Sequence, residues 1–282
     1  MRFSLILATV NRVKEVKRFL QSLAKQTYTN FELIVVDQNP DNRLVPILDA
    51  FKSVFYIVHL RSTPGLSRAR NIGLRYIKGD IVAFPDDDCW YPPHLLERVS
   101  HIFTNTSIDG VTGMAVDGSG KPLGGWDKKP GFLNIYNVWR RAISYTIFLR
   151  NEVVCTLGEF DENLGVGAST PWGSGEETDY LLKAIKKGFS IYYEPTIKIY
   201  HPQKNISSKK ALHYARGMGY VLRKHQYSPW FFIYWQLRSL VGIGEAIIRG
   251  DWQKAMIRWA YVKGRLQGWR AISRDKEGNN GQ

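Results

Sequence analysis

The first hundred residues alternate short apolar runs with amphipathic segments, and this alternation constrains the fold more than any other feature. Four runs rich in β-branched and aromatic residues have the composition of strands buried on both faces: 3–8, 31–36, 55–60 and 81–84. Between them lie segments with apolar residues at helical spacing: 13–25, 44–51 and 67–77. Strand–helix–strand repetition at this spacing predicts an α/β fold with a mostly parallel sheet and right-handed crossovers.

Polar residues follow each of the four predicted strands. Ligands of open parallel sheets bind outside the carboxyl ends of the strands, so these residues carry most of the functional information. The segments are "TVNR" (9–12), "DQNP" (37–40), "RSTPGLSRARN" (61–71) and "PDDD" (85–88). We therefore expect one functional site along this edge of the sheet.

Three successive carboxylates, Asp86, Asp87 and Asp88, follow the apolar run 81–84. Negative charges this close together repel one another and need a positive partner if they are buried. Asp86 and Asp88, two residues apart at the start of a turn, can both bind one hard divalent cation such as Mg²⁺ or Mn²⁺. A solvated acidic turn is the alternative, but the position directly after a central apolar strand favours the metal.

The positive charge of the chain is concentrated near its C-terminal end. Residues 203–276 contain 15 Lys and Arg against three Asp and Glu, and so carry +12 of the formal net charge of +14. A block of this kind usually faces a polyanion, either nucleic acid or an anionic membrane surface.

On a helical wheel, residues 252–269 place apolar and basic side chains on opposite sides. The apolar side holds Trp252, Ala255, Met256, Trp259, Val262 and Leu266, and the basic side Lys254, Arg258 and Arg265, although Lys263 interrupts the apolar side. Because this pattern suits a helix lying in a membrane interface, we expect an anionic membrane surface and no nucleic acid as partner. Packing of the apolar side on the preceding domain is the alternative.

We expect a cytoplasmic protein that lies on the cytoplasmic face of a membrane without crossing it. The first residues, "MRFSLILATVNR", lack the features of a signal peptide, and the apolar run 230–235 is far shorter than a membrane span. Cys89 and Cys155 are distant in sequence and form no paired motif, which fits a reducing compartment.

Six segments, in order, resemble the family 2 glycosyltransferases of GT-A fold: "ILATVNR", "ELIVVDQNP", "GLSRARNIGL", "DIVAFPDDDCWYPPHLL", "FDENLGVG" and "WGSGEETDYLLKAIKKGFSIYYEP". The resemblance covers about residues 1–202. It implies a Rossmann-like sheet flanked by helices, a nucleotide-diphosphate sugar donor, a divalent metal (Mg²⁺ or Mn²⁺) and inversion by direct displacement. The acceptor would be a hydroxyl of a glycan or lipid-linked molecule in cell-surface polysaccharide or glycolipid synthesis. A non-catalytic relative that binds nucleotide-sugar or scaffolds a glycan assembly complex is the alternative.

This resemblance divides the chain into three parts. Residues 1–202 would form the catalytic domain, with nucleotide-sugar binding in 1–108 and acceptor binding in 109–202. A basic, aromatic helical extension would occupy 203–272 and a disordered tail 273–282. The sequence pattern is weak over 109–175 and returns with a helix at 176–187 and strands at 189–193 and 198–200. We expect acceptor specificity in the loop 117–131 and in the segment 160–173.

The resemblance also implies nucleotide-sugar-binding roles at the strand ends. Thr9 and Arg12 would line the nucleotide pocket, Asp37 would contact the base, and Arg68 and Arg70 would approach the ribose or phosphates. The two arginines could instead brace the helix that they begin. This chain has "DQNP" where family members often carry a second acid and Gly-Ser, which puts the base contact in doubt.

For the metal, the resemblance makes Asp88 the principal ligand and places Asp86 near both ribose and metal. Some relatives carry a histidine at the position of His201, reaching the metal from the opposite side. A lone histidine at a strand end also serves purely structural roles, and this alternative stays open for His201.

The resemblance assigns the general base to the acid pair Glu176 and Glu177. Both stand at the start of a predicted helix, where the helix dipole favours an ionised carboxylate. We assign the base to Glu177 and the orientation of the acceptor to Glu176, although both, with Asp179, could merely cap the helix. Trp172 could stack on a sugar face of the acceptor or be an ordinary core residue.

Overall fold

The computed structural model describes residues 1–203 and 205–278, and the chain divides into two compact units. The first consists of Met1–Phe160 and Tyr180–Gln203, and the second of Asp161–Asp179 and Lys204–Gln282. Residues 161–179 therefore group with the helices that follow residue 203, whereas the sequence assigned them to the catalytic domain.

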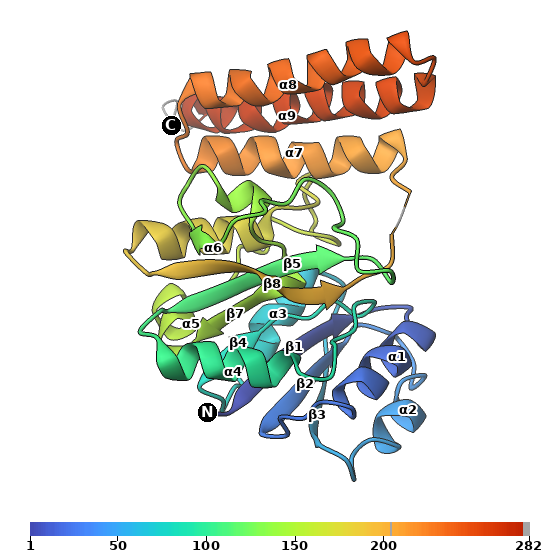
Figure 1. The fold of residues 1–282 in the computed structure, drawn as a ribbon. Helices are drawn as coiled ribbons and strands as arrows, with labels where there is room; N and C mark the ends of the chain where they lie inside the picture. The colour runs from blue at the N-terminus through green and yellow to red at the C-terminus, as the bar shows by residue number, and fades with distance from the viewer. Residues whose placement is uncertain (204, 279–282) are drawn as a thin grey trace. The chain divides into compact units, whose positions relative to one another are not determined.

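A mixed eight-stranded sheet forms the centre of the first unit, in the order β3-β2-β1-β4-β7-β5-β8-β6 (Figure 1). Its strands are β1 (Phe3–Thr9), β2 (Phe31–Asp37), β3 (Tyr56–Arg61), β4 (Ile81–Ala83), β5 (Gly110–Val116), β6 (Gly131–Phe132), β7 (Ile147–Arg150) and β8 (Ile191–Tyr200). β7 pairs antiparallel with β4 and β5, and β6 pairs antiparallel with β8. The other six strands run in one direction, so their carboxyl ends meet at one edge of the sheet.

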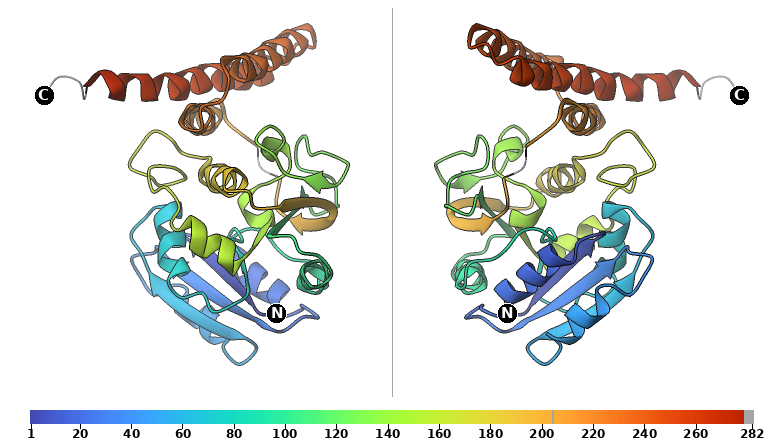
Figure 2. Two further views of the ribbon diagram at one scale, coloured as in Figure 1. Left: turned by 90° about the vertical axis from the view of Figure 1, so that its left-hand side faces the viewer. Right: turned by 90° about the vertical axis from the view of Figure 1, so that its right-hand side faces the viewer.

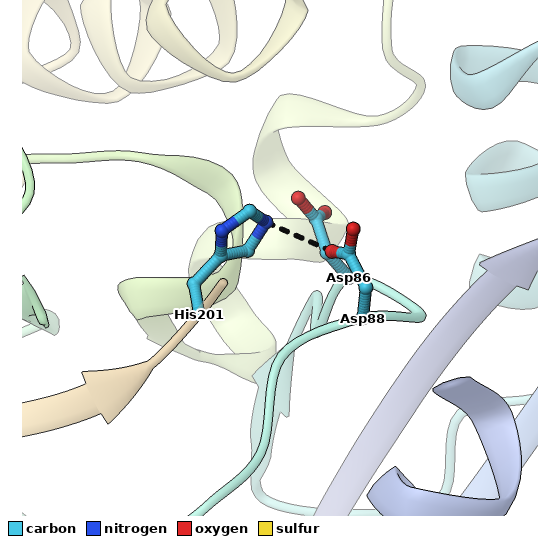
Figure 3. Close-up of side chains that lie close together, drawn as sticks. All are labelled: Asp86, Asp88 and His201. Atoms are coloured by element: carbon cyan, nitrogen blue, oxygen red, sulfur yellow. Dashed lines mark ion pairs between the residues drawn. The ribbon is translucent and has the colours of Figure 1, made fainter. Parts of the chain in front are cut away.

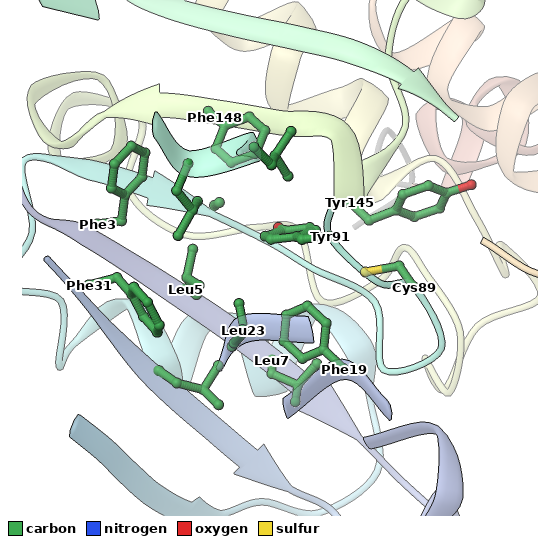
Figure 4. Packing of buried hydrophobic residues seen from close by; sticks show 14 of the residues in the cluster. Phe3, Leu5, Leu7, Phe19, Leu23, Phe31, Cys89, Tyr91, Tyr145 and Phe148 are labelled. Carbon is green, nitrogen blue, oxygen red and sulfur yellow. The ribbon is translucent and has the colours of Figure 1, made fainter. Parts of the chain in front are cut away.

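Helices cover both faces of this sheet because successive side chains of a strand point to opposite faces. Phe3, Leu5 and Leu7 of β1 pack against α1 (Lys14–Leu23) and α4 (Leu95–Asn105), and Figure 4 shows this core. Ile6 points to the other face, toward α3 (Leu66–Leu74), and Figure 2 shows α3 and α4 on opposite sides of the strands. The unit also contains α2 (Val45–Asp49), α5 (Asn151–Leu157) and two 3₁₀ turns, Val138–Arg140 and Ser144–Thr146.

The strands and helices predicted in the first hundred residues form within a few residues of the expected positions. Two-sided burial is wrong for the third run, because β3 is an edge strand whose side chains are all at least partly exposed. The weakly patterned region 109–175 contains β5, β6, β7 and α5. The two strands expected at 189–193 and 198–200 are one strand, β8, whose register with β5 shifts between Thr112 and Met114.

The second unit contains three helices that lie side by side in Figure 1: α7 (Ser208–Lys224), α8 (Pro229–Ile248) and α9 (Trp252–Gly278). α7 and α8 begin at serine caps, where Ser207 accepts a hydrogen bond from the Lys210 N–H and Ser228 from the Trp230 N–H. α9 extends into the expected disordered tail as far as Gly278, and the rest of that tail, 279–282, lies outside the described residues. Between the units, α6 (Glu176–Lys186) begins in the second and ends in the first.

Two expectations about these helices are wrong. α8 has 20 residues and includes an 18-residue window with a mean hydropathy of 1.2, so by length and composition alone it could cross a membrane, contrary to the expectation that no apolar run reaches the length of a span. Arg265 does not lie on a solvated basic face of α9: it is 3% exposed, and its guanidinium donates to Gln236 and Ser239 of α8. Trp252, Met256 and Trp259, in contrast, are all more than half exposed.

Candidate functional site

The turn after β4 carries the three carboxylates to the edge where the parallel strands end. Asp86 forms a parallel bridge with Ala8 of β1, which extends the pairing of β4 with β1 into the turn. Trp90, at the end of the turn, exchanges two backbone hydrogen bonds with Tyr200, the last residue of β8, and stacks on its ring. This bridge brings His201, the next residue of the chain, to the same edge as the carboxylates.

Asp86, Asp88 and His201 form a cluster whose candidate ligand atoms all lie within 4.8 Å of one another (Figure 3). Two carboxylates and one imidazole are donors that suit Mn²⁺, and Mg²⁺ accepts the carboxylates. Asp86 and Asp88 follow β4, whereas His201 follows β8. The two segments meet because β4 and β8 run in the same direction, with only β7 and β5 between them. The predicted metal ligands are therefore together in one place.

The side chains that face Asp88 answer part of the charge problem raised by the sequence. Asp88 is only 2% exposed; one carboxylate oxygen lies 2.8 Å from His201 Nε2 and the other 3.4 Å from Arg12 Nη1. Arg18 donates to the Asp88 backbone carbonyl, and its guanidinium stacks over Trp90. Arg12, expected in the nucleotide pocket, thus contacts a predicted metal ligand.

Both ring nitrogens of His201 have a polar neighbour. Its Nδ1 lies 2.8 Å from the Pro202 carbonyl oxygen, which can only accept, so Nδ1 carries a proton. In the neutral imidazole Nε2 then presents a lone pair, and it faces an Asp88 oxygen at 2.8 Å. Two acceptors at this distance need a proton or a cation between them. The ring stacks on Tyr145 at 4.8 Å, which fixes its orientation.

Asp86 occupies a partly buried position between a hydroxyl and a guanidinium. The Ser144 hydroxyl donates to Oδ1 at 3.0 Å, and Arg70 Nη2 lies 3.4 Å from the same oxygen. Burial, opposed by Arg70 and assisted by the charge of Asp88, raises the pKa of Asp86. Arg70 itself is 1% exposed and lies over the rings of Phe84 and Phe160, so it supports Asp86 from inside the core.

Asp87 points away from the cluster, toward the end of β1. Its Oδ2 accepts a hydrogen bond from Thr9 Oγ1 at 2.9 Å, so Thr9, expected to line the nucleotide pocket, braces this turn. Burial, only partly offset by Thr9 and Arg12, raises the pKa of Asp87 to about 6. Of the three acids, Asp87 alone is outside the candidate metal-binding group.

Asp37 lies at the end of β2, and its side chain is fully buried among hydrogen-bond and ion-pair partners. Its carboxylate accepts from both the backbone N–H and the side-chain amide of Asn39, and contacts His59 Nε2 at 3.0 Å and Arg61 Nη1 at 2.9 Å. A base contact by Asp37 would have to share oxygens already bound to these groups. Arg68 lies on the surface of α3 and donates to the Thr63 hydroxyl, apart from the buried Arg70.

The predicted general base belongs to the second unit, in the segment 161–179 that packs on α7. Trp172 stacks on Tyr220 at 5.0 Å, and Ser174 Oγ donates to the Tyr214 carbonyl. A Cβ at Gly173 would lie 1.6 Å from the His213 ring, so any larger residue there would displace that side chain. This packing leads to the start of α6, where Glu176 is buried and Glu177 is half-buried.

Lys224, at the C-terminal end of α7, binds both ends of this segment. Its Nζ lies 2.7 Å from Asp161 and 2.8 Å from Asp179, and His225 Nε2 lies 2.8 Å from the same Asp179 oxygen. Asp179, considered as a possible helix cap, is thus an anchor of the segment to α7. Trp172 has a structural partner in Tyr220, so the core alternative for this residue describes its observed contacts.

Several contributors to the site were missed from the sequence. Ser144 and Tyr145 belong to a 3₁₀ turn in the weakly patterned region, and only the antiparallel insertion of β7 brings them to Asp86 and His201. Arg18 lies on the first helix, whose apolar spacing marks the buried face and gives no sign of the Asp88 contact. No local motif in the sequence distinguishes these residues from ordinary surface or turn positions.

Comparison with known proteins adds to this geometry. The family model "Glycosyl transferase family 2" matches residues 4–155. An uncharacterized glycosyltransferase of Haemophilus influenzae is 34% identical over 99 residues, 35% of this chain and 33% of that protein. The Escherichia coli UDP-Glc:alpha-D-GlcNAc-diphosphoundecaprenol beta-1,3-glucosyltransferase WfgD is 32% identical over 104 residues, 36% of this chain and 41% of that protein. Both matches span well under half the length of these relatives.

Among solved structures, that of Staphylococcus aureus TarS superimposes with a TM-score of 0.65 at 17% identity, covering 93% of this chain and 55% of TarS. A protein of this name is described as a poly(ribitol-phosphate) beta-N-acetylglucosaminyltransferase. At this identity the likeness concerns the fold. The α/β fold of GT-A type, the C-terminal helices and the enzyme class predicted from the sequence are confirmed, whereas the roles of individual site residues stay predictions.

Proposed function

Because the chain belongs to glycosyl transferase family 2, we propose that it transfers a sugar from a nucleotide-diphosphate donor to a hydroxyl group of a glycan or lipid-linked acceptor. The reaction is a direct displacement with inversion at the anomeric carbon. Two similar enzymes, by their names, act on phosphate-bearing glycan acceptors, one lipid-linked and one a polyol phosphate polymer. These acceptors support a role in cell-surface polysaccharide or glycolipid synthesis.

The observation that carries this proposal is the cluster of Asp86, Asp88 and His201 at the carboxyl edge of the sheet. A donor diphosphate is strongly anionic, and the buried carboxylates would repel it without a cation. Asp88, Asp86 and His201 would hold a divalent ion, Mg²⁺ or Mn²⁺, that neutralises the diphosphate leaving group. Arg12 and Arg70, both beside these acids, add positive charge to the same place.

The acceptor hydroxyl must lose its proton as it attacks, and a carboxylate within hydrogen-bond reach is the natural recipient. We assign this role to Glu177, with Glu176 orienting the acceptor. Both stand in the first turn of α6, where the helix dipole stabilises the ionised carboxylate. The contacts of segment 161–179 with α7 fix the backbone from which these side chains project.

We further propose that the protein is cytoplasmic and works at the cytoplasmic face of an anionic membrane. The exposed Trp230 of α8 and Trp252 and Trp259 of α9 have the amphipathic character of interfacial anchors, and basic residues are abundant in the same helices. A surface-bound arrangement suits α8 better than a span, because Arg265 makes polar contacts along it through Gln236 and Ser239. Nucleic acid is not expected to bind.

A donor screen followed by a transfer assay tests the proposed activity. The full chain is heated with each of a panel of nucleotide-diphosphate sugars, with and without Mn²⁺ or Mg²⁺. The matching donor should raise the melting temperature only when the metal is present, and a saturating ligand at 100 times its Kd stabilises by about 2.7 kcal/mol. Release of nucleoside diphosphate and a mass increase of the acceptor should follow. Metal-dependent donor binding without transfer to any glycan or lipid-linked acceptor would instead support the non-catalytic alternative.

A further inference from the structure

A second polar site lies in the first unit, in the loop that follows β5. A shallow cavity, open to solvent and about 380 Å³ in volume, is lined by Trp126, Asp127, Lys128, Lys129, Arg140 and Arg141. Four of these side chains are cationic and one is a carboxylate, so the lining is strongly positive. This is a volume typical of small-ligand pockets. None of these residues was assigned a role from the sequence individually.

The arginines of this cavity are held in place by the rest of the loop. Asp127 lies 2.7 Å from Arg141 Nε and 3.2 Å from Arg140 Nη2, so one carboxylate orients both guanidinium groups. Arg140 also donates to the Gly125 carbonyl, and Arg141 to the Phe132 carbonyl. These bonds use only part of the donors, since each guanidinium has five N–H groups.

The buried Tyr193 of β8 anchors the loop from below. Its hydroxyl donates to the Asp127 carbonyl at 2.8 Å, and its ring stacks on Trp126 and lies under the Arg141 guanidinium. Trp126 Nε1 donates to the Leu123 carbonyl, which fixes the indole as one wall of the cavity. The cavity is therefore built on the sheet and does not depend on surface side chains alone.

Lys128 and Lys129 also line the cavity, and neither forms an ion pair with a carboxylate of the described residues. Both side chains are exposed. Their charges add to those of the two arginines at close range. An anion in the cavity would relieve this repulsion, and arginine forks match phosphate oxygens in geometry.

Chain connections join this cavity to the catalytic edge of the sheet, although its contacts with Tyr193 lie near the amino end of β8. Its loop starts at the carboxyl end of β5, where the Val116 carbonyl accepts from the His201 N–H. Arg141 lies three residues before Ser144, which donates to the predicted metal ligand Asp86. A ligand in the cavity is thus bound to the same segments that form the candidate active site.

We propose that this cavity binds a phosphate group of the acceptor, so that the acceptor substrates of this enzyme are phosphate-bearing glycans. The inference rests on the proposed glycosyltransferase function. The lysines and arginines bind the phosphate oxygens, and Trp126 offers an aromatic surface to the adjoining sugar or polyol. The phosphate can belong to a lipid-linked diphosphate or to a phosphodiester of a polyol phosphate polymer.

Nuclear magnetic resonance of the full chain tests the site directly. The indole N–H signal of Trp126, assigned by its loss in Trp126→Phe, is followed while geranyl diphosphate or glycerophosphoglycerol is added in EDTA. Without divalent cations, the Asp86–Asp88–His201 cluster cannot recruit the probe through a metal. We expect saturable movement of this signal with at least one probe, and the responding probe distinguishes the diphosphate from the phosphodiester source.

The variant Lys128→Gln/Lys129→Gln should weaken binding about tenfold or more, equivalent to about 1.4 kcal/mol. The exposed pair Lys186→Gln/Lys187→Gln, at the end of α6, removes the same charge and should leave binding unchanged. No movement with either probe, or equal affinity in both variants, would overturn the proposal. Donor binding with Mn²⁺, measured in the same samples, separates this outcome from failure of the proposed function, because it depends on Asp88 and not on the lysines.

Discussion

The three adjacent carboxylates of the turn after β4 have three different environments. Asp88 faces His201 and Arg12, Asp86 faces Ser144 and Arg70, and Asp87 accepts a hydrogen bond from Thr9. Because the side chains diverge from one backbone turn, only two of them can reach one ion. This separation makes the metal assignment testable at single residues.

Asp88→Asn should nearly abolish divalent-metal binding and sugar transfer, since it replaces the anionic ligand that both His201 and Arg12 approach. Titration of the protein with Mn²⁺, followed by electron paramagnetic resonance, measures the affinity directly. Asp87→Asn is the matched control: it keeps a polar partner for Thr9 and should bind Mn²⁺ nearly as well as the unmodified protein. Transfer that persists undiminished in EDTA would refute the metal assignment.

Glu177→Gln should lower turnover by about 10² or more, a typical contribution of a general base, while donor affinity stays unchanged. The amide keeps the shape and hydrogen bonds of the acid but cannot take the proton from the acceptor hydroxyl. Single-turnover transfer and donor titration, measured on the same preparation, separate the two effects. If Glu177→Gln transfers normally and Glu176→Gln does not, the base is Glu176.

At the scale of elements, the first four strands could be predicted because each is a continuous apolar run ended by turn residues. The inserted strands β5 and β7 could not, since β7 has only four residues and owes its antiparallel place to long-range pairing. The predicted metal ligands Asp86 and Asp88 share a local motif. The proximity of His201 depends on the bridge between Trp90 and Tyr200, which no local pattern encodes.

The packing of α9 on α7 could not be predicted from the apolar face of a helical wheel either. The two helices approach through glycines: a Cβ at Gly268 would lie 2.0 Å from the Arg216 carbonyl oxygen, and one at Gly264 would lie 2.5 Å from that of Leu212. A helical wheel marks glycine as neither apolar nor polar. The wheel therefore marked only the tryptophan side, expected in a membrane interface or packed on the preceding domain, whereas the closest approach to α7 is at Gly264 and Gly268.

Gly268→Ala should destabilise the protein by about 1–3 kcal/mol, the usual cost of forcing an extra group into a packed interface. Gly244→Ala in α8 is the control, because a Cβ there meets nothing within 4 Å. It should stabilise by about 0.4–1 kcal/mol through reduced freedom of the unfolded chain. Urea unfolding monitored by circular dichroism compares the two. Equal stabilities would contradict the close approach of α7 and α9.

At the scale of the whole molecule, the division of the chain changes how membrane binding should be tested. Residues 161–179 include both candidate base residues, Glu176 and Glu177, and share a unit with α7, α8 and α9. Deleting the chain after residue 203 would remove Lys224 and Tyr220, which hold Asp179 and Trp172. A truncated protein could then lose transfer for reasons unrelated to membranes. Substitutions on exposed side chains avoid this difficulty.

Trp252→Glu/Trp259→Glu should release the protein from liposomes that contain anionic lipid. Both indoles are more than half exposed, so the change spares the packed side of α9 while placing two charges where interfacial anchors are expected. Each basic residue near such a surface contributes roughly 1 kcal/mol, so binding of the unmodified protein should also fall as salt rises. Flotation of liposomes in a density gradient measures the bound fraction.

The control Val54→Glu/Tyr136→Glu adds the same charge at two exposed apolar positions of the first unit and should float like the unmodified protein. A gel-shift assay with duplex DNA and single-stranded RNA at the same ionic strength tests the other polyanion, and no shift is expected. The flotation of Trp252→Glu/Trp259→Glu, compared with this control, decides whether these tryptophans bind the membrane. If the tryptophan variant floats as well as its control, the exposed tryptophans of α9 do not mediate membrane binding. The +12 charge of residues 203–276 would then need another partner.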